Sequence, residues 1–353
     1  MLITHVEVIP VEFDLRIPYR LLSGTDVSRV GAVFCRIETQ QGATAWGCTA
    51  VDPAFTDQTL AQVTRACQDC ADRARDLNPL NTEYALAELS DVAGEVRSAL
   101  CAFDLAFHDL LGLVTGLPLY RLLGGYRQRI QTSITLRRAP LQETVELARG
   151  YARQGFRILK IKSSHDANTD VRRMRAVRDA LPGLTLRLDV EGGYTVQQAL
   201  DVARALEGTL EMIEQPTPPQ DVDALQEITR RSVVPILADE SVAGPASALD
   251  IASRRAADGI TIKLVTCGGL HCARQMDAIA RAARLSTMIG CVHEPGLLIA
   301  AGLGVALSSR NVRYGDLDGA MHLIDDPTVP GYHLEDGWLI ARDVPGLGCT
   351  VDL

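Results

Sequence analysis

The chain has 353 residues, of which 47% are hydrophobic and 22% charged, a composition typical of a globular enzyme with a large core. Its formal net charge of −9 gives no general reason to bind nucleic acid or an anionic membrane. No apolar run near the ~18 residues of a membrane span is evident, and the first residues lack the features of a signal peptide. Nine scattered cysteines are typical of free thiols in a reducing cytoplasm.

Residues 1–125 are expected to form an α+β domain. Alternating segments at 4–13 and 31–40 predict strands, with Gly42 in the turn after the second. The segment 60–77 predicts a helix, whose single CxxC pair, Cys67 and Cys70, is weak support for a zinc site. A longer helix is predicted over 98–115 and ends at Gly116.

From residue 129 onward, eight short apolar runs alternate with helical patterns. The runs are RIQTSITL, FRILKIK, LTLRLDV, LEMIEQP, VPILADES, GITIKLV, LSTMIGCVHE and VRYGDLD. This alternation predicts a closed parallel (β/α)8 barrel with room for one altered unit, and an open doubly wound sheet is the alternative. No GxGxxG follows the first run, so the nucleotide-binding version has little support. The expected divisions are a capping domain at 1–125, a barrel at 126–319, and a tail at 320–353 that packs back on the first domain.

Polar residues recur at a nearly constant interval near the carboxyl ends of the barrel strands. The steps between them are 27, 25, 25, 24, 28 and 25 residues, about one strand–helix unit each. The carboxyl ends of barrel strands form the active-site face, so these residues are expected to surround one pocket mouth. They are Lys162, Asp189, Glu214, Asp239, Lys263, Cys291 and Asp316.

Three successive members of this series are acids: Asp189, Glu214 and Asp239. Carboxylates held together repel one another unless a cation lies among them. Two aspartates and a glutamate suit a hard ion, Mg²⁺ most naturally, with positions left for water or substrate. The alternative interpretation is three unrelated acids in salt bridges or helix caps.

Lys162 and Lys263 fall on the second and sixth predicted barrel strands and are expected to face each other across the pore. A cation on a substrate carboxylate stabilises the enediolate formed at its α-carbon, with one lysine as base and the other as acid. Return of the proton on the opposite side inverts the stereocentre. Lys160 shares a strand face with Lys162, so its charge and the cation are expected to lower the pKa of Lys162. Lys160 is also a candidate contact to the substrate carboxylate.

The whole chain resembles the enolase superfamily, in particular its muconate-lactonizing-enzyme subgroup. The matching motifs are KIK (160–162), RLDVE (187–191), IEQP (213–216), ADES (238–241), IKLVTCGGL (262–270) and GCVHE (290–294). The resemblance implies an α/β fold with an N-terminal α+β capping domain and a modified (β/α)7β barrel. It implies one Mg²⁺ per subunit on Asp189, Glu214 and Asp239, with Lys162 and Lys263 as the acid/base pair.

The segment YGDLDGA places Asp316 and Asp318 two residues apart after the eighth strand, where such a pair can hold an ammonium group. This DxD motif is similar to that of dipeptide epimerases, which implies that it binds the α-ammonium of the first residue while the second residue is epimerised. A turn or a helix cap is the alternative interpretation of the same two acids.

Two departures from the subgroup pattern concern the barrel side of the pocket. Glu191 stands where Asn is usual and shares a face with Asp189, so it adds negative charge near the metal. His293 and Glu294 stand where relatives carry other residues and are expected to line the pocket, with a structural role as the alternative for His293.

A third departure lies in the loop at 16–28, which is expected to cover the pocket. Gly24 corresponds to an arginine that Ala-Glu epimerases use to hold an acidic side chain. Tyr19, Leu21 and Leu22 favour an apolar second residue, whereas Arg20 counters that argument. Glu191 and Glu294 would instead favour a cationic side chain.

The sequence therefore predicts a Mg²⁺-dependent dipeptide epimerase that interconverts L,L and L,D dipeptides, with broad and somewhat apolar specificity. Thr135 and Cys291 are further candidate substrate contacts, with ordinary barrel positions as the alternative. Six other histidines are predicted to be structural or on the surface: His5, His108, His165, His271, His322 and His333. The expected partner is a small dipeptide, without nucleic acid or membrane, in a cytoplasmic homo-oligomer.

Rival functions keep the same site. An N-acylamino acid racemase, an o-succinylbenzoate synthase or a cycloisomerase such as muconate lactonizing enzyme would need no ammonium clamp. A non-catalytic barrel that senses metal and peptides is a rival of another class, and the intact lysine pair argues against it.

Overall fold

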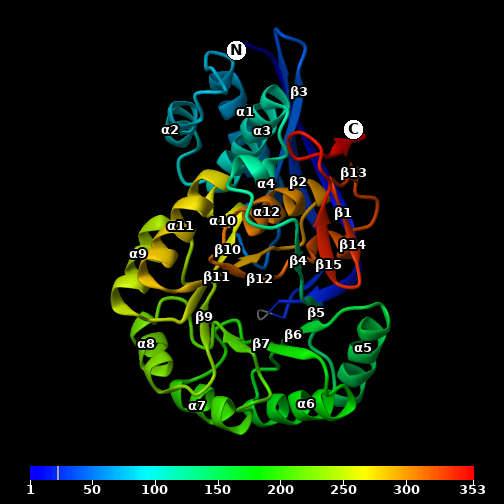
Figure 1. The fold of residues 1–353 in the computed structure, drawn as a ribbon, viewed down its shortest axis with the longest axis vertical. Helices are drawn as coiled ribbons and strands as arrows, with labels where there is room; N and C mark the ends of the chain where they lie inside the picture. The colour runs from blue at the N-terminus through cyan, green and yellow to red at the C-terminus, as the bar shows by residue number, and fades with distance from the viewer. Residues whose placement is uncertain (22–23) are drawn as a thin grey trace.

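A computed structural model of the chain describes residues 1–21 and 24–353 (Figure 1). An antiparallel three-stranded sheet forms the capping domain, in the upper part of the view. Its strands are β1 (Ile3–Arg20), β2 (Asp26–Thr39) and β3 (Thr44–Val51). The sequence predicts the first two strands, and Gly42 lies with φ of +80° in the turn that joins them to the third, a conformation that suits glycine.

Helices α1 (Leu60–Ala74) and α3 (Arg97–Thr115) pack on this sheet, α2 (Thr82–Ala93) packs on α1 and α3, and α4 (Leu119–Leu122) packs on α3. Cys67 and Cys70 lie on the buried side of α1, and all nine cysteines in the described part of the chain are free. Helix α3 is long and apolar enough to meet a membrane-span criterion, with 72% of its apolar window buried inside the protein. It packs so closely on β3 that a Cβ added to Gly47 would lie 1.9 Å from the carbonyl oxygen of Ala102, which marks α3 as a core helix.

The second domain is an eight-stranded parallel sheet in which the strands follow one another in chain order. This arrangement, with its outer helices, confirms the predicted α/β class and (β/α)7β barrel. The strands are β5 (Ile134–Leu136), β6 (Ile158–Lys162), β7 (Thr185–Asp189), β8 (Met212–Glu214), β9 (Ile236–Ala238), β10 (Gly259–Lys263), β11 (Ser286–Gly290) and β12 (Val312–Gly315). The helices are α5 (Leu141–Arg153), α6 (Ala167–Ala180), α7 (Val196–Ala205), α8 (Val222–Arg231), α9 (Pro245–Arg254), α10 (Leu264–Cys267), α11 (Leu270–Ala283) and α12 (Gly296–Ser308).

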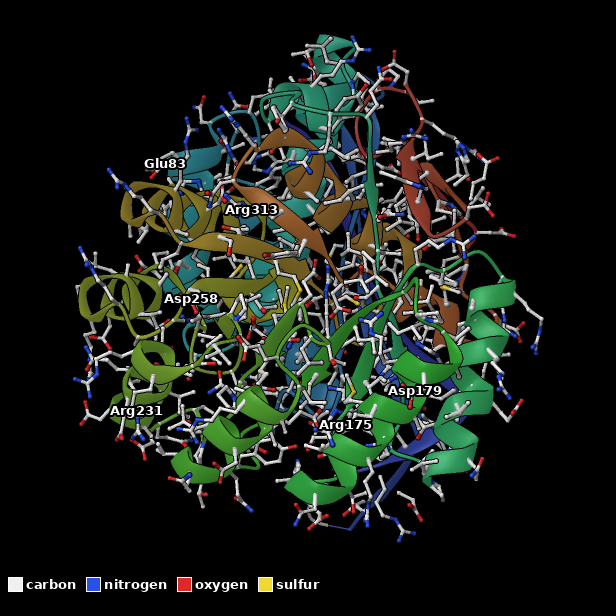
Figure 2. All side chains as sticks on the ribbon, turned by 60° about the horizontal axis from the view of Figure 1, so that its bottom comes forward. Glu83, Arg175, Asp179, Arg231, Asp258 and Arg313 are labelled. Atoms are coloured by element: carbon white, nitrogen blue, oxygen red, sulfur yellow. The ribbon has the colours of Figure 1, made fainter. Side chains whose placement is uncertain are left out.

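The outer helices follow the amphipathic pattern expected around a barrel. In α8, the apolar Leu225 and Ile228 are buried, whereas Arg231 is exposed. Figure 2 shows the exposed charges Arg175 and Asp179 on the outward side of α6. The helices therefore bury their apolar sides against the strands and leave the strand ends free to form a site.

The first barrel strand differs from the prediction. The run RIQTSITL is two strands, because β4 (Arg129–Gln131) pairs antiparallel with the tail and only β5 joins the barrel. Thr132, between them, bridges to Gly315 at the end of β12, and the amide of Ser133 donates to the carbonyl of Gly315 at 3.0 Å. These contacts connect the first and last barrel strands.

The tail returns to the capping domain. It contains η1 (Gly319–His322), β13 (Thr328–Val329), β14 (Tyr332–Glu335), β15 (Trp338–Ala341) and β16 (Thr350–Val351). The amide of Leu119 donates to Gly346 O at 2.8 Å, and Leu323 bridges to Leu15 of β1. The exact boundaries at 125 and 319 stay a prediction, because β4 and the tail share one sheet.

Asp109 of α3 connects the capping sheet to the tail, and its removal should be costly. Its buried carboxylate accepts from the partly buried amide of Trp46 at 3.1 Å and from the buried amide of Leu347 at 2.7 Å. Asp109→Ala leaves two backbone amides unpaired and should reduce the free energy of unfolding by about 2–4 kcal/mol, measured by urea denaturation. Asp343→Ala, which breaks an exposed ion pair with Arg121, should cost less than about 1 kcal/mol. Equal losses in the two variants would contradict this assignment.

Candidate active site

The residues of the predicted ring lie at one end of the barrel. Lys162, Asp189 and Glu214 are the last residues of β6, β7 and β8, and they are direct register partners across the sheet. Lys263 ends β10. Three others come directly after their strands: Asp239 after β9, Cys291 after β11 and Asp316 after β12. The parallel register therefore gathers these side chains from separate segments at one mouth.

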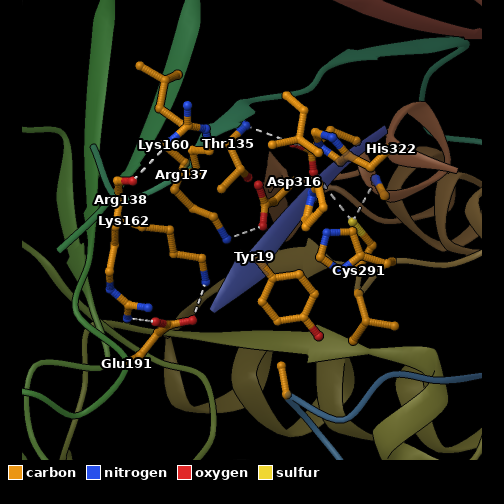
Figure 3. A pocket seen from close by; sticks show the side chains of 18 of the residues that line it. Tyr19, Thr135, Arg137, Arg138, Lys160, Lys162, Glu191, Cys291, Asp316 and His322 are labelled. Atoms are coloured by element: carbon orange, nitrogen blue, oxygen red, sulfur yellow. Dashed lines mark hydrogen bonds and ion pairs between the residues drawn. The ribbon is translucent and has the colours of Figure 1, made fainter. Parts of the chain in front are cut away.

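A cavity of about 330 Å³ lies over this mouth, between the barrel and the capping domain. Figure 3 shows side chains that line it, among them Lys160, Lys162 and Asp316 from the barrel and Tyr19 from β1. Lys263 lines the same cavity, so both predicted acid/base lysines reach one space.

Lys160 lies at the centre of the charge cluster and is almost fully buried. Its ammonium contacts Asp316, and it lies 3.3 Å from Asp189 Oδ2 and 3.4 Å from Glu214 Oε2. Burial alone would lower the pKa of Lys160, but these three carboxylates raise it well above its ordinary value. Lys160 is therefore a fixed positive charge in this site.

The three acids Asp189, Glu214 and Asp239 are buried next to one another, and their environment fits a cation. Asp189 Oδ1 has no hydrogen-bond partner although it is buried. Burial raises the pKa of Glu214 to about 7, and the charges of Asp189 and Asp239 act in the same direction. A buried carboxylate oxygen without a partner and crowded negative charge are what a hard oxygen-binding ion would relieve. Within residues 1–21 and 24–353, no three Asp, Glu, His or Cys side chains are already arranged so that they could coordinate a metal ion together.

Lys162 and Lys263 are held by different acids. The ammonium of Lys162 donates to Asp189 at 2.8 Å and to Glu191 at 2.6 Å. That of Lys263 donates to Asp239 and lies 4.2 Å from the centre of the Phe55 ring, a cation–π contact. The two amines therefore approach the cavity from separate strands.

The prediction that the pKa of Lys162 is lowered is wrong for the protein without a bound cation. Burial lowers this pKa, and the charge of Lys160 lowers it further, as predicted. Asp189 and Glu191 outweigh both effects and raise the pKa above its ordinary value. Two carboxylates at hydrogen-bond distance stabilise the ammonium more than one lysine destabilises it. A neutral Lys162 amine therefore requires that this negative charge is offset.

Asp316 and Asp318 both line the cavity but have different neighbours. Asp316 accepts from Ser133 Oγ at 2.6 Å and contacts Lys160. Asp318 accepts from the amide of Thr135 at 2.7 Å and from Cys291 Sγ at 3.6 Å. Thr135 and Cys291, predicted as substrate contacts, thus line the cavity and also support Asp318.

The wall of the cavity toward the cap contains a pair of stacked rings. Tyr19 and His293 stack at a centroid distance of 4.9 Å, and both bind the buried carboxylate of Asp52. The ring of His322 lies edge-on to His293, and its Nε2 lies 3.6 Å from Asp318. The sequence placed His322 among structural or surface residues, and the structure places it in the cavity wall instead.

Two predicted contacts do not line the cavity in the described residues. Glu294 is buried behind the wall, where its carboxylate accepts from the amide of Val292 and burial raises its pKa to about 8. Gly24 is exposed, with φ of +88° in a turn, and Leu22 lies outside the described residues. Arg20 forms a two-point ion pair with Asp26, with distances of 2.7 and 2.8 Å.

Sequence reasoning missed Asp52, Phe55 and Arg138. Asp52 and Phe55 come from the capping domain after β3, where no periodic pattern marks a site. Arg138 follows the first barrel strand by two residues, so its position after a predicted strand was an available signal. His322 also had one, because it lies four residues after Asp318, a spacing that brings side chains together on one helical turn.

Comparisons with known proteins agree with this geometry. The N-terminal domain family of mandelate racemase and muconate lactonizing enzyme matches residues 3–124, and the enolase C-terminal domain-like family matches residues 143–353. The L-Lys-D/L-Arg epimerase of Methylococcus capsulatus is 34% identical, with 99% of each chain covered. The hydrophobic dipeptide epimerase of Enterococcus faecalis is 31% identical, covering 99% of this chain and 100% of the relative.

A solved structure extends the similarity to three dimensions. The dipeptide epimerase of Enterococcus faecalis V583, in complex with Mg and the dipeptide L-Leu-L-Tyr, superposes with a TM-score of 0.95. It is 30% identical and covers 99% of this chain and 100% of its own. The fold and the site thus define an isomerase of the epimerase and racemase class.

The chain belongs to the mandelate racemase and muconate lactonizing enzyme family of the enolase superfamily, within its dipeptide epimerases. The names of these relatives give substrates as different as hydrophobic dipeptides and dipeptides of Lys and Arg. Membership of the family therefore does not by itself identify the substrate.

Removal of one predicted ligand should abolish cation binding without unfolding the protein. Mg²⁺ at about 100 times its dissociation constant should raise the free energy of unfolding by about 2.7 kcal/mol, seen as a higher melting temperature. Asp189→Asn should lose this shift, because it neutralises the acid that carries the unpartnered oxygen. Asp316→Asn, a change to an acid of the same cluster outside the predicted ligand set, should keep it. An unchanged shift in Asp189→Asn would contradict the assignment.

Proposed function

We propose that this protein inverts the α-carbon of the second residue of L,L-dipeptides: one lysine removes the α-proton, and a second lysine gives a proton to the opposite side of the carbon. The observation that carries the proposal is that Lys162 and Lys263 reach one cavity from barrel strands four positions apart, each held by its own acid. Two amines on separate sides of one carbon are what an inversion by a 1,1-proton transfer requires.

We propose that Asp189, Glu214 and Asp239 hold one Mg²⁺ per subunit. Two observations support this: Asp189 Oδ1 has no hydrogen-bond partner, and the structure of the Enterococcus relative contains Mg. When bound, this cation stabilises the negative charge that develops on the substrate carboxylate as its α-carbon loses a proton. Lys160, kept protonated by its carboxylates, provides a further positive charge beside that carboxylate.

The two lysines divide the proton transfer between them. The neutral lysine removes the α-proton on its side, and the ammonium opposite returns a proton on the other side. Lys263 is buried against the Phe55 ring, which excludes water from that side. Lys162 remains next to Asp189 and Glu191, so its use as a base depends on positive charge nearby.

The first residue of the dipeptide is proposed to place its ammonium on Asp318 and Asp316. Both carboxylates are buried and line the cavity, and an ammonium is the group that such a pair can bind by charge-assisted hydrogen bonds. Asp316 already holds the Lys160 ammonium, whereas Asp318 accepts from the amide of Thr135 and lies 3.6 Å from His322 Nε2.

The proposed preference is broad and somewhat apolar. Ile17, Phe55, Leu136 and Leu147 supply apolar wall to the cavity. Arg20, which would have favoured an acidic side chain, is neutralised by Asp26. The apolar wall and the neutralised Arg20 favour a second residue like the tyrosine of L-Leu-L-Tyr, the dipeptide in the structure of the Enterococcus relative.

Proton NMR in D₂O with Mg²⁺ and a dipeptide library tests the reaction directly. The α-proton signal of the second residue should disappear as deuterium enters, and L,D product should appear. Lys162→Ala and Lys263→Ala should each lower epimerisation at least 1,000-fold, since each removes one side of the transfer (about 4 kcal/mol). Retention of the α-proton across the whole library would exclude the proposal and favour a non-catalytic sensor.

The ammonium clamp separates dipeptides from N-acylated substrates. Asp318→Asn should lower kcat/KM for dipeptides about 10- to 100-fold, because it weakens a charge-assisted hydrogen bond. The same variant should leave N-acetyl or N-succinyl amino acids within about threefold, and so provides its own control. Higher wild-type activity on the acylated substrates would instead identify an N-acylamino acid racemase.

A further inference from the structure

One guanidinium connects the ends of three barrel strands next to Lys162. Arg138 follows β5, and its Nε donates to the carbonyl of Ser163, just after β6, at 2.7 Å. Its Nη2 pairs with the Glu191 carboxylate, just after β7. Figure 3 shows Arg138, Glu191 and Lys162 in a row along one side of the cavity.

Glu191 uses both carboxylate oxygens within this row. Its Oε1 accepts from Lys162 at 2.6 Å, and its Oε2 is held by Arg138. Its backbone has φ of +51°, a left-handed conformation that is uncommon for a residue with a side chain. The next turn is tightly packed, since a Cβ on Gly193 would lie 2.3 Å from the ring of His165. The fold therefore fixes Glu191 at some conformational cost.

The two lysines differ in how much the protein immobilises them. The Lys263 side chain is 4% exposed and has the Phe55 ring over its ammonium. The Lys162 side chain is 21% exposed and has no such ring among its contacts in the described residues. A flexible lysine stem loses conformational entropy when it is held at one position, so the more open lysine has greater need of a fixed acceptor.

We propose that Glu191, fixed by Arg138, is a positioning residue that aims the Lys162 ammonium at the cavity. The inference rests on the proposed two-lysine function and deepens it. Each Glu191 oxygen already binds a charged group of the protein, so the proposed role of Glu191 is toward Lys162 and not toward a cationic substrate side chain. Glu191 therefore affects only the proton transfer that uses Lys162, and not the transfer that uses Lys263.

One-sided action gives the test. Deuterium exchange at the α-carbon is measured by NMR at early times, separately from pure L,L and pure L,D dipeptide, with Mg²⁺ present. Lys162→Ala first identifies which of the two configurations needs Lys162. Glu191→Gln should slow exchange from that configuration about 10- to 100-fold, the scale expected for a misplaced catalytic group, and leave the other within about threefold. The loss should fall on kcat, with KM for the dipeptide within about threefold.

Matched variants control for folding and for charge. Glu146→Gln makes the same chemical change on the exposed side of α5 and should leave both exchange rates unchanged. Arg138→Lys retains the charge but loses the geometry that reaches Ser163 O and Glu191 together, so it should show the same one-sided loss in weaker form. Melting temperatures of all variants are measured in parallel, so a general loss of structure appears as a lower melting temperature together with equal slowing of exchange from both configurations.

Each other outcome overturns the inference. Equal slowing from both configurations would mean a structural role, and no slowing would mean that Lys162 needs no support. A loss confined to dipeptides with Lys or Arg second residues would make Glu191 a recognition residue. Wild-type protein that exchanges no dipeptide would overturn the proposed function as well, whereas an active wild type with symmetric Glu191→Gln rates overturns the positioning role alone.

Discussion

The site depends on the burial of acids and amines side by side at the carboxyl ends of parallel strands. Parallel register places Lys162, Asp189 and Glu214 at the same level on neighbouring strands. Any two of these acids would repel if left alone, and Lys160 alone contacts or approaches three carboxylates. The protein therefore keeps alternating charges in close contact, and Asp189 still retains an oxygen without a partner. That imbalance favours a further cation.

The same charge network explains why the two lysines are not equivalent. Lys263 is enclosed by Asp239 and the Phe55 ring, and that ring comes from the capping domain. Lys162 is held by Asp189 and Glu191 of the barrel, and Glu191 is held in turn by Arg138. The capping domain thus supports Lys263, and the loops after β5 and β7 support Lys162. A cavity with two differently supported amines suits a reaction in which each direction uses a different base.

The capping domain also connects substrate recognition to the fold. Asp52, buried after β3, binds Tyr19 of β1 and His293 of the barrel together. His293 contacts the ring of His322, which lies beside Asp318 of the proposed clamp. Asp318 of the proposed clamp therefore belongs to a network that crosses from barrel to cap, so a change at the rings would affect both the wall of the cavity and this carboxylate.

The sequence by itself determined the elements and the ring of polar residues, because apolar runs and their polar ends follow the repeat of a strand and a helix. It also identified the lysine pair and the three acids, whose spacing equals one repeat. It did not separate β4 from β5, since the antiparallel partner of β4 lies some 200 residues further on, in β15. Only the tertiary structure decided that Asp52 and Phe55 belong to the site and that Glu294 and Gly24 do not line it. The physical reason is that these positions result from the packing of the cap and the tail against the barrel, and contacts between segments so distant in the chain leave no local pattern.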